Sequence, residues 1–199
     1  MRLTRVPAQR DSVGRMSKPS LADAIAETLF SREQIDAKIA ELSTVIEDDY
    51  RDKNPLVIGI LSGCYPFMAD LTRALDIQLE VDFMACSSYE GTTKSSGVVR
   101  ILKDLNTSIE NRHVLIVEDI IDTGLTLKYL VENLQTRQPA SIEICTLLDK
   151  HEARSENVEV RYRGFVCPNK FVVGYGLDYD GHYRNLPYIG VLKPEVYSS

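Results

Sequence analysis

Residues 114–126 read VLIVEDIIDTGLT, and this stretch indicates how the chain folds. It opens with four apolar residues bounded by polar ones, a run typical of a short strand that is buried on both faces of a sheet. We therefore predict a strand over 114–118. The Thr-Gly-x-Thr that begins at Thr123 predicts a turn, followed by a helix that lies within 123–137.

Three acidic residues lie between this strand and this helix: Glu118, Asp119 and Asp122. A plain interpretation is that acids cap the helix and offset its dipole. Three acids within five residues are more than capping requires. Free N–H groups at the helix start, with the hydroxyls of Thr123 and Thr126, predict an anion site. Carboxylates repel a bare phosphate, so we expect them to bind sugar hydroxyls or Mg²⁺ on the same ligand, a phosphorylated sugar.

The rest of the chain alternates between predicted strands and helices. Ser31 and Gln34 match a capping box, which predicts a helix from Ser31 to about Tyr50. The alternation predicts an α/β fold, with a mostly parallel twisted sheet flanked by helices. The other predicted elements are a strand at 56–61, a helix at about 66–75, a strand at 79–85, a long mobile loop at 88–98 and a strand at 141–148.

The carboxyl ends of the predicted strands indicate where a ligand binds. In open α/β sheets, ligands bind in the crevice outside these ends. We therefore expect four segments to meet at one site: 62–64, 88–98, 118–126 and 149–151.

Length and charge suggest one domain with a tail. The chain has 199 residues and a net charge of −6. Residues 1–18 hold five basic residues and one acid, a net charge of +4, which leaves −10 for the remainder. We expect residues 1–20 to be a basic, disordered tail, with an organelle-targeting segment as the alternative, and residues 21–199 to be the domain.

Composition argues against two classes of partner. An acidic body lacks the basic surface that releases counterions from nucleic acid, so we expect no nucleic-acid partner. No apolar stretch approaches the roughly 18–20 residues of a membrane helix, so we expect no membrane partner. The four cysteines form no C-x-x-C motif, which favours free thiols in a reducing compartment and predicts a cytoplasmic protein.

Two residues beyond the last predicted strands are candidates for recognising a planar ligand. Lys150 comes just after the predicted strand at 141–148, separated from it by Asp149. Phe171 lies further along the chain. An aromatic face can stack on a purine, and a lysine can donate to its 6-oxo oxygen. Taken singly, Lys150 also fits a solvated loop cation and Phe171 a core aromatic.

Several of these segments resemble one known family. VEDIIDTG resembles the phosphoribosyl-diphosphate motif of the type I phosphoribosyltransferases, and most closely its hypoxanthine-guanine branch. TLLDK at 146–150, KFVVGYGLDY at 170–179 and YRNLPYIG at 183–190 resemble the same branch. The resemblance spans roughly residues 28–197. It implies the type I fold with a small hood subdomain, formed by the N-terminal helix region and about 158–197.

The resemblance also implies roles for the acids and for a metal. Asp122 would be the catalytic general base near the purine nitrogen N7. Glu118 and Asp119 would hold the ribose hydroxyls, directly or through Mg²⁺, and Asp178 would ligate a second Mg²⁺. The metal-binding residues implied are therefore Glu118, Asp119 and Asp178.

Further positions are implied to contact substrate. Lys150 would contact the 6-oxo group, Phe171 would stack on the base and the Val172 backbone would read the base edge. Ser88 and Tyr89 match the start of the family's mobile catalytic loop, a lid over the reacting centre. The other implied substrate-binding residues are Ser62, Gly63, Ile120, Ile121, Thr123, Gly124, Leu125, Thr126, Lys170 and Arg184.

One departure concerns the turn at 61–63. Family members commonly have Leu-Lys-Gly where this chain has Leu61, Ser62 and Gly63. That turn is expected to bind pyrophosphate through backbone amides, often with a non-proline cis peptide. Because amides survive the change to Ser62, we expect pyrophosphate binding to persist.

The implied activity converts hypoxanthine or guanine plus 5-phosphoribosyl 1-diphosphate to IMP or GMP plus pyrophosphate, with Mg²⁺ as cofactor. The alternatives are a xanthine-accepting transferase, a non-catalytic ligand-sensing regulator on the same fold, or a generic nucleotide binder. The family also implies a homodimer or homotetramer.

Overall fold

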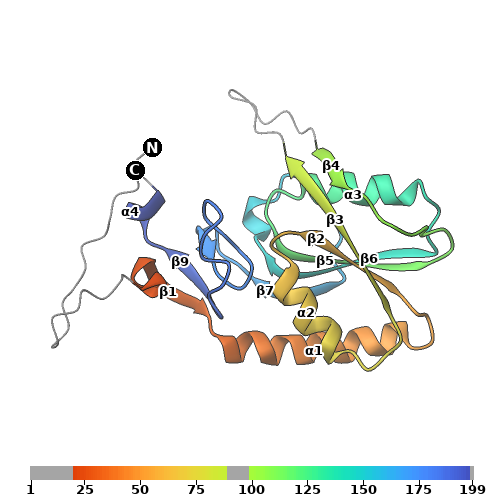
Figure 1. Cartoon of the computed structure of the whole chain (residues 1–199), viewed down its shortest axis with the longest axis horizontal. Helices are drawn as coiled ribbons and strands as arrows, with labels where there is room; N and C mark the ends of the chain where they lie inside the picture. Colours follow the sequence, from red (N-terminus) through yellow and green to blue (C-terminus); the bar gives the residue numbers. More distant parts are fainter. Residues whose placement is uncertain (1–19, 89–98, 198–199) are drawn as a thin grey trace.

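A computed structural model describes residues 20–88 and 99–197 of the chain (Figure 1). These residues form a large sheet with its helices and, beside it, a small sheet that contains elements from both ends of the described chain. The predicted tail at 1–20 lies outside the described residues except for Ser20, and the predicted loop at 88–98 lies outside them except for Ser88.

The large sheet has six strands and is mostly parallel. Every neighbouring pair is parallel except the pair at the β4 edge, which is antiparallel. This confirms the predicted fold class. In spatial order the strands are β4 (Val99–Lys103), β3 (Glu80–Ser88), β2 (Leu56–Leu61), β5 (His113–Ile121), β6 (Ser141–Asp149) and β7 (Tyr162–Val166).

Helices cover both faces of the large sheet, with α1 (Arg32–Tyr50) and α2 (Tyr65–Ala74) on one face and α3 (Leu125–Gln135) on the other (Figure 1). Neighbouring side chains of a strand point to opposite faces. Val57 of β2 therefore packs with α1 and α2, whereas Ile58 packs with α3. Because both faces are covered, these strands are apolar at nearly every position.

The start of α1 confirms the predicted capping box. The Ser31 hydroxyl accepts from the Gln34 amide at 3.3 Å, and the Gln34 side-chain oxygen accepts from the Ser31 amide at 2.8 Å. Two of the otherwise unpaired N–H groups at this end are thus satisfied. The helix runs to Tyr50, as the apolar spacing predicts.

The small sheet corrects the predicted composition of the hood. Its antiparallel strands are, in order, β1 (Ile25–Phe30), β9 (Ile189–Leu192) and β8 (Val172–Val173). The N-terminal strand of this sheet is β1, and α1 packs in a core that contains residues of both sheets. The segment 158–197 is also divided, because β7 pairs with β6 of the large sheet. Short apolar runs look alike in both sheets, and only the pairing distinguishes them.

Two boundaries near the predicted site also change. β5 does not end at 118 but continues to Ile121, because it pairs with β6 as far as Ile121 and Asp149. The acids therefore begin inside the strand, where Glu118 and Asp119 are part of β5. β4, which was not predicted, follows the undescribed segment and pairs with β3, which runs to Ser88 instead of 85.

Three short helices complete the described chain: the 3-10 helices at Leu21–Ala24 and His151–Ala153, and α4 (Pro194–Tyr197). All four cysteines are free thiols, as predicted. Within the ranges that the structure describes, no helix is both long enough and apolar enough to cross a membrane.

Candidate active site

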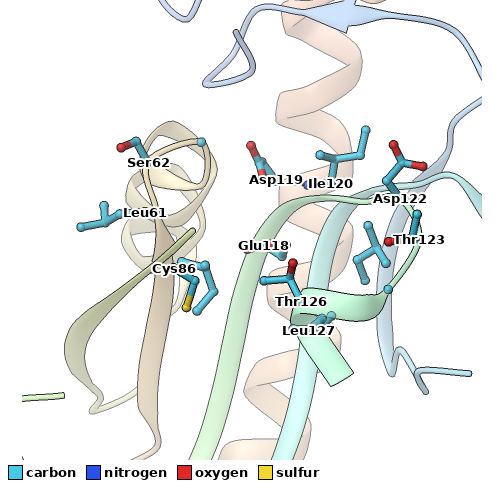
Figure 2. Close-up of a pocket in the computed structure, with 14 residues that line it drawn as sticks. Leu61, Ser62, Cys86, Glu118, Asp119, Ile120, Asp122, Thr123, Thr126 and Leu127 are labelled. Carbon is cyan, nitrogen blue, oxygen red and sulfur yellow. Dashed lines mark hydrogen bonds between the residues drawn. The ribbon is translucent and has the colours of Figure 1, made fainter. Parts of the chain in front are cut away.

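The carboxyl ends of β2, β3 and β5 enclose a pocket, which we call the β5 pocket (Figure 2). Figure 2 shows Leu61 and Ser62 on one side of it and Asp119 and Asp122 on the other. The predicted convergence of 62–64 with 118–126 is thus present. Its lining consists of Ile60, Leu61, Ser62, Gly63, Cys86, Glu118, Asp119, Ile120, Ile121, Asp122, Thr123, Gly124, Thr126 and Leu127.

Two buried acids dominate the electrostatics of the β5 pocket. Burial, and then the charge of Asp119, raise the pKa of Glu118 well above its usual range. Burial also raises the pKa of Asp119 to about 6, although the Ile120 amide donates to its Oδ1 at 2.9 Å. The uncomplexed site therefore disfavours the charge of both acids, and a cation would offset this cost.

The donor set fits a magnesium ion that the protein holds only in part. Glu118 Oε2 is buried, and no described residue hydrogen-bonds to it. Among the described residues, no group of three or more potential ligands surrounds one point. Mg²⁺ commonly takes one or two carboxylates and completes its shell with water and substrate phosphates. Glu118 and Asp119 meet that description.

The turn after β2 approaches these acids closely. The peptide bond between Leu61 and Ser62 is cis. A Cβ placed on Gly63 would lie 1.6 Å from Asp119 Oδ2, so only glycine leaves room for the carboxylate. The backbone of this turn therefore lies against Asp119, where its amides could bind an anion beside a cation held by the acids.

The start of α3 lies where the anion site was predicted. Gly124 precedes the helix with φ 85°, a conformation that favours glycine, and its carbonyl accepts the Lys128 amide at 2.9 Å. The Leu125 amide donates only a long hydrogen bond, to Thr123 Oγ1 at 3.4 Å. Free amides at a helix start attract phosphate. Thr123, Gly124 and Thr126 line the β5 pocket beside them.

A second pocket adjoins the first, and we call it the Lys150 pocket. It contains Asp119, Ile120 and Asp122, which it shares with the β5 pocket. Lys150 Nζ lies 3.6 Å from Asp122 Oδ2, so the cation and the exposed acid lie together. A ligand that fills both pockets would therefore pass along Asp119 and Asp122. The remaining lining residues are Lys150, Phe171, Val172, Leu177 and Asp178.

A buried ion cluster supports the two pockets. Asp149, just before Lys150, is fully buried and pairs with Arg154 at 2.9 Å and with Arg163 at 2.6 Å. The same segment reaches the turn before α3, because the Ser155 and Glu156 amides both donate to the Thr123 carbonyl at 3.1 Å. Sequence reasoning missed this cluster, whose members are separated along the chain and carry no motif.

Some predicted contacts lie outside the described pocket linings. Lys170 forms an ion pair with Glu27 of β1. Arg184 pairs with Asp178 Oδ1 at 2.7 Å and donates to the Gly176 carbonyl at 2.6 Å. Leu125 also lies outside both pocket linings. Its backbone amide is one of the N–H groups at the start of α3.

Tyr89 and the side chain of Ser88 lie outside the described residues, although the Ser88 backbone ends β3. Conversely, sequence reasoning missed Cys86 and Leu177 as lining residues. Cys86 fell beyond the predicted end of its strand, and Leu177 lies inside a recognised block but carries no polar group that would mark it.

Comparison with known proteins gives a consistent result. A hypoxanthine-guanine phosphoribosyltransferase of Lactococcus lactis is 54% identical over 183 residues, which cover 92% of this chain and 100% of that protein. The bifunctional protein TilS/HprT of Listeria monocytogenes is 52% identical over 179 residues, or 90% of this chain, but the chain spans only 28% of that relative's length.

A solved structure and a domain family agree with these relatives. The crystal structure of a hypoxanthine phosphoribosyltransferase from Staphylococcus aureus has a TM-score of 0.87 and 50% identity, covering 90% of this chain and 97% of that chain. The phosphoribosyl transferase domain family matches residues 26–180, which include all the residues that line the β5 pocket and the Lys150 pocket. The chain therefore belongs to the phosphoribosyltransferase family.

Proposed function

We propose that this chain is a purine-salvage transferase that converts hypoxanthine or guanine plus 5-phosphoribosyl 1-diphosphate to IMP or GMP plus pyrophosphate. The observation that carries this is the junction of two pockets at Asp119–Asp122. One pocket has an anion cradle beside acids, and the other has a lysine and an aromatic ring. A phosphorylated sugar fits the first, and a 6-oxopurine fits the second.

The Lys150 pocket supplies the groups that bind and activate the purine. Lys150 donates to the 6-oxo oxygen, Phe171 stacks on the ring and the Val172 backbone contacts the base edge. Asp122 acts as general base at the purine nitrogen N7 while N9 forms the bond to the anomeric carbon. This role is supported by the exposed carboxylate of Asp122, which lines both pockets.

The β5 pocket supplies the groups that bind the sugar phosphates. The amides and hydroxyls from Thr123 to Thr126 bind the 5′-phosphate, and Ile120 and Ile121 form the adjoining wall. The backbone amides of Ser62 and Gly63 bind pyrophosphate. Because pyrophosphate is bound through backbone amides, this binding does not require the lysine that the family commonly has in place of Ser62. Further proposed substrate contacts are Ser88, Tyr89, Lys170 and Arg184.

The proposed cofactor is Mg²⁺, held by Glu118 and Asp119 with the ribose hydroxyls and, at a second position, by Asp178. When bound, the metal neutralises the pyrophosphate as it leaves. The carboxylates of this chain favour the cationic character that develops at the anomeric carbon. Asp178 is held in place by Arg184 and by the Gly181 amide, which donates to it at 2.8 Å.

The proposed assembly is a homodimer or homotetramer, and the proposed compartment is the cytoplasm. Four free cysteines support a reducing compartment. Analytical ultracentrifugation of the full chain measures its oligomeric state. A monomer at all micromolar concentrations would contradict the proposed assembly.

The direct test is to incubate the chain with phosphoribosyl diphosphate, Mg²⁺ and hypoxanthine. The proposed function predicts IMP and pyrophosphate in equal amounts. Binding of phosphoribosyl diphosphate without turnover would instead favour a ligand-sensing regulator.

A further inference from the structure

Two tyrosines contact the proposed purine-stacking residue, Phe171. The Tyr197 ring stacks on Phe171, with ring centroids 5.1 Å apart and planes 22° apart. The Tyr179 ring meets Phe171 edge-on at 5.5 Å and 87°. Tyr179 and Tyr197 also contact each other at 6.5 Å. We call Phe171, Tyr179 and Tyr197 the aromatic trio.

The trio has one member inside the Lys150 pocket and two outside it. Phe171 lines the pocket together with Lys150 and Asp122, whereas Tyr179 and Tyr197 are not among its described lining residues. Tyr197 therefore contacts the phenyl ring from outside the pocket. An arrangement of this kind leaves Phe171 able to receive a planar ligand on its pocket side.

The position of Tyr197 is set by the small sheet. The Leu192 amide at the end of β9 donates to the Phe171 carbonyl at 3.0 Å, and the Lys193 amide donates to the Ala24 carbonyl at 2.9 Å. Val196 packs against the buried cluster around Val173. Figure 1 shows α4 following β9 at this end of the molecule. These contacts hold the segment that carries Tyr197 against the small sheet.

We propose that Tyr197 is a positioning residue for purine recognition, which stacks on the outer side of Phe171 and holds its ring ready for the base. This inference rests on the proposed function. Phe171 is 40% exposed and precedes β8, so an isolated phenyl ring there would retain rotamer freedom that binding must remove. A ring that is already held loses less freedom when the purine stacks on it.

The test compares Tyr197→Ala, Tyr197→Phe and Tyr129→Ala in steady-state assays with hypoxanthine and phosphoribosyl diphosphate. Tyr129 on α3 is a matched control, because it is 38% exposed and Tyr197 is 37% exposed. Loss of one aromatic pair predicts that Tyr197→Ala raises KM for hypoxanthine about fivefold. The KM for phosphoribosyl diphosphate and kcat should stay within about twofold. Tyr197→Phe and Tyr129→Ala should match the unaltered chain.

Each other outcome overturns the inference. An unchanged KM for hypoxanthine in Tyr197→Ala shows that the stack does not position Phe171. A lowered KM shows that Tyr197 competes with the purine. Equal changes in both KM values, with a lowered melting temperature, indicate a structural role. No turnover by the unaltered chain overturns the proposed function and this inference together, whereas an active chain with unchanged KM overturns the inference alone.

Discussion

Lys150 and Asp122 lie in direct electrostatic contact, with the lysine Nζ 3.6 Å from the aspartate Oδ2. The lysine side chain is 11% exposed and the aspartate 56%, so the cation is the better fixed of the two. In the proposed reaction both groups face the same purine, at its 6-oxo oxygen and at the neighbouring N7. Their separation lets one ring engage both, because these two purine atoms lie on the same edge.

Replacing the proposed general base tests the chemical step. Asp122→Asn keeps the shape of the side chain but cannot accept a proton, and loss of general-base catalysis lowers rates by about 10²–10⁴-fold. We expect kcat for IMP formation to fall by about 100-fold with little change in KM for phosphoribosyl diphosphate. Asp52→Asn is the control, an exposed Asp outside both pockets. Unchanged turnover in Asp122→Asn would refute the assignment.

Replacing the lysine tests base selection. Lys150→Met keeps most of the side-chain length but removes the donor to the 6-oxo oxygen. Hydrogen bonds that involve a charged group contribute about 1.5–3 kcal/mol, so kcat/KM for hypoxanthine should fall by about 10–150-fold. Measuring the same ratio for guanine provides the internal comparison, since both bases carry the 6-oxo group. A loss for one base and not for the other would contradict the role.

The buried acid Asp119 predicts a pH dependence of stability in the metal-free protein. Burial raises its pKa from 3.8 to about 6, so the folded chain binds this proton more tightly than the unfolded chain. The contribution of this group to stability therefore falls as pH rises from about 4 to about 6, then stays constant. Full conversion of the shift gives about 3 kcal/mol. Because this carboxyl lines the β5 pocket, which water can enter, we expect a smaller contribution of about 1–2 kcal/mol.

Asp119→Asn removes this titration. Thermal unfolding in the presence of a chelator should show the variant more stable than the unaltered chain above pH 6, with the difference shrinking toward pH 4. A difference that does not depend on pH would contradict the assigned cause. Added Mg²⁺ with phosphoribosyl diphosphate should stabilise the unaltered chain more than the variant.

The buried ion cluster predicts a large loss of stability. Arg154→Met leaves Asp149 buried with one of its two cationic partners, and breaking a buried pair typically costs about 3–5 kcal/mol. Chemical denaturation measures this loss. Arg51→Met is the control, because Arg51 is 65% exposed in its pair with Asp48 and exposed pairs contribute about 0–1 kcal/mol. If the two substitutions lowered the free energy of unfolding equally, burial would not determine how much each ion pair contributes to stability.

Local patterns in the sequence predicted much of this structure. The apolar run of β2 gave its bounds, and the capping box gave the start of α1, because both signals depend on neighbouring residues. The ends of β5 were wrong because pairing with β6 carries the strand past its polar residues. The strands β1 and β4 were missed. Their half-exposed sequences are short, and β1 in addition pairs with β9 at the other end of the chain.

In the site, too, features within one segment were predicted and contacts between segments were not. The acids at the end of β5 and the start of α3 belong to one continuous segment, so a single stretch of sequence predicted them together. The contact of Asp149 with Arg163 and the stack of Tyr197 on Phe171 join distant segments. No spacing rule reveals such pairs, because each depends on which strands pair within its own sheet, β6 with β7 for the ion pair and β8 with β9 for the stack.

The central claim is that this chain transfers a phosphoribosyl group to a 6-oxopurine, and a comparison of bases tests it most directly. We would measure kcat/KM with phosphoribosyl diphosphate and Mg²⁺ for hypoxanthine, guanine, xanthine and adenine. The account predicts efficient use of hypoxanthine or guanine and a kcat/KM for adenine lower by at least about 100-fold, since a 6-amino group cannot accept from Lys150. Preference for adenine, or no turnover of any base, would contradict it.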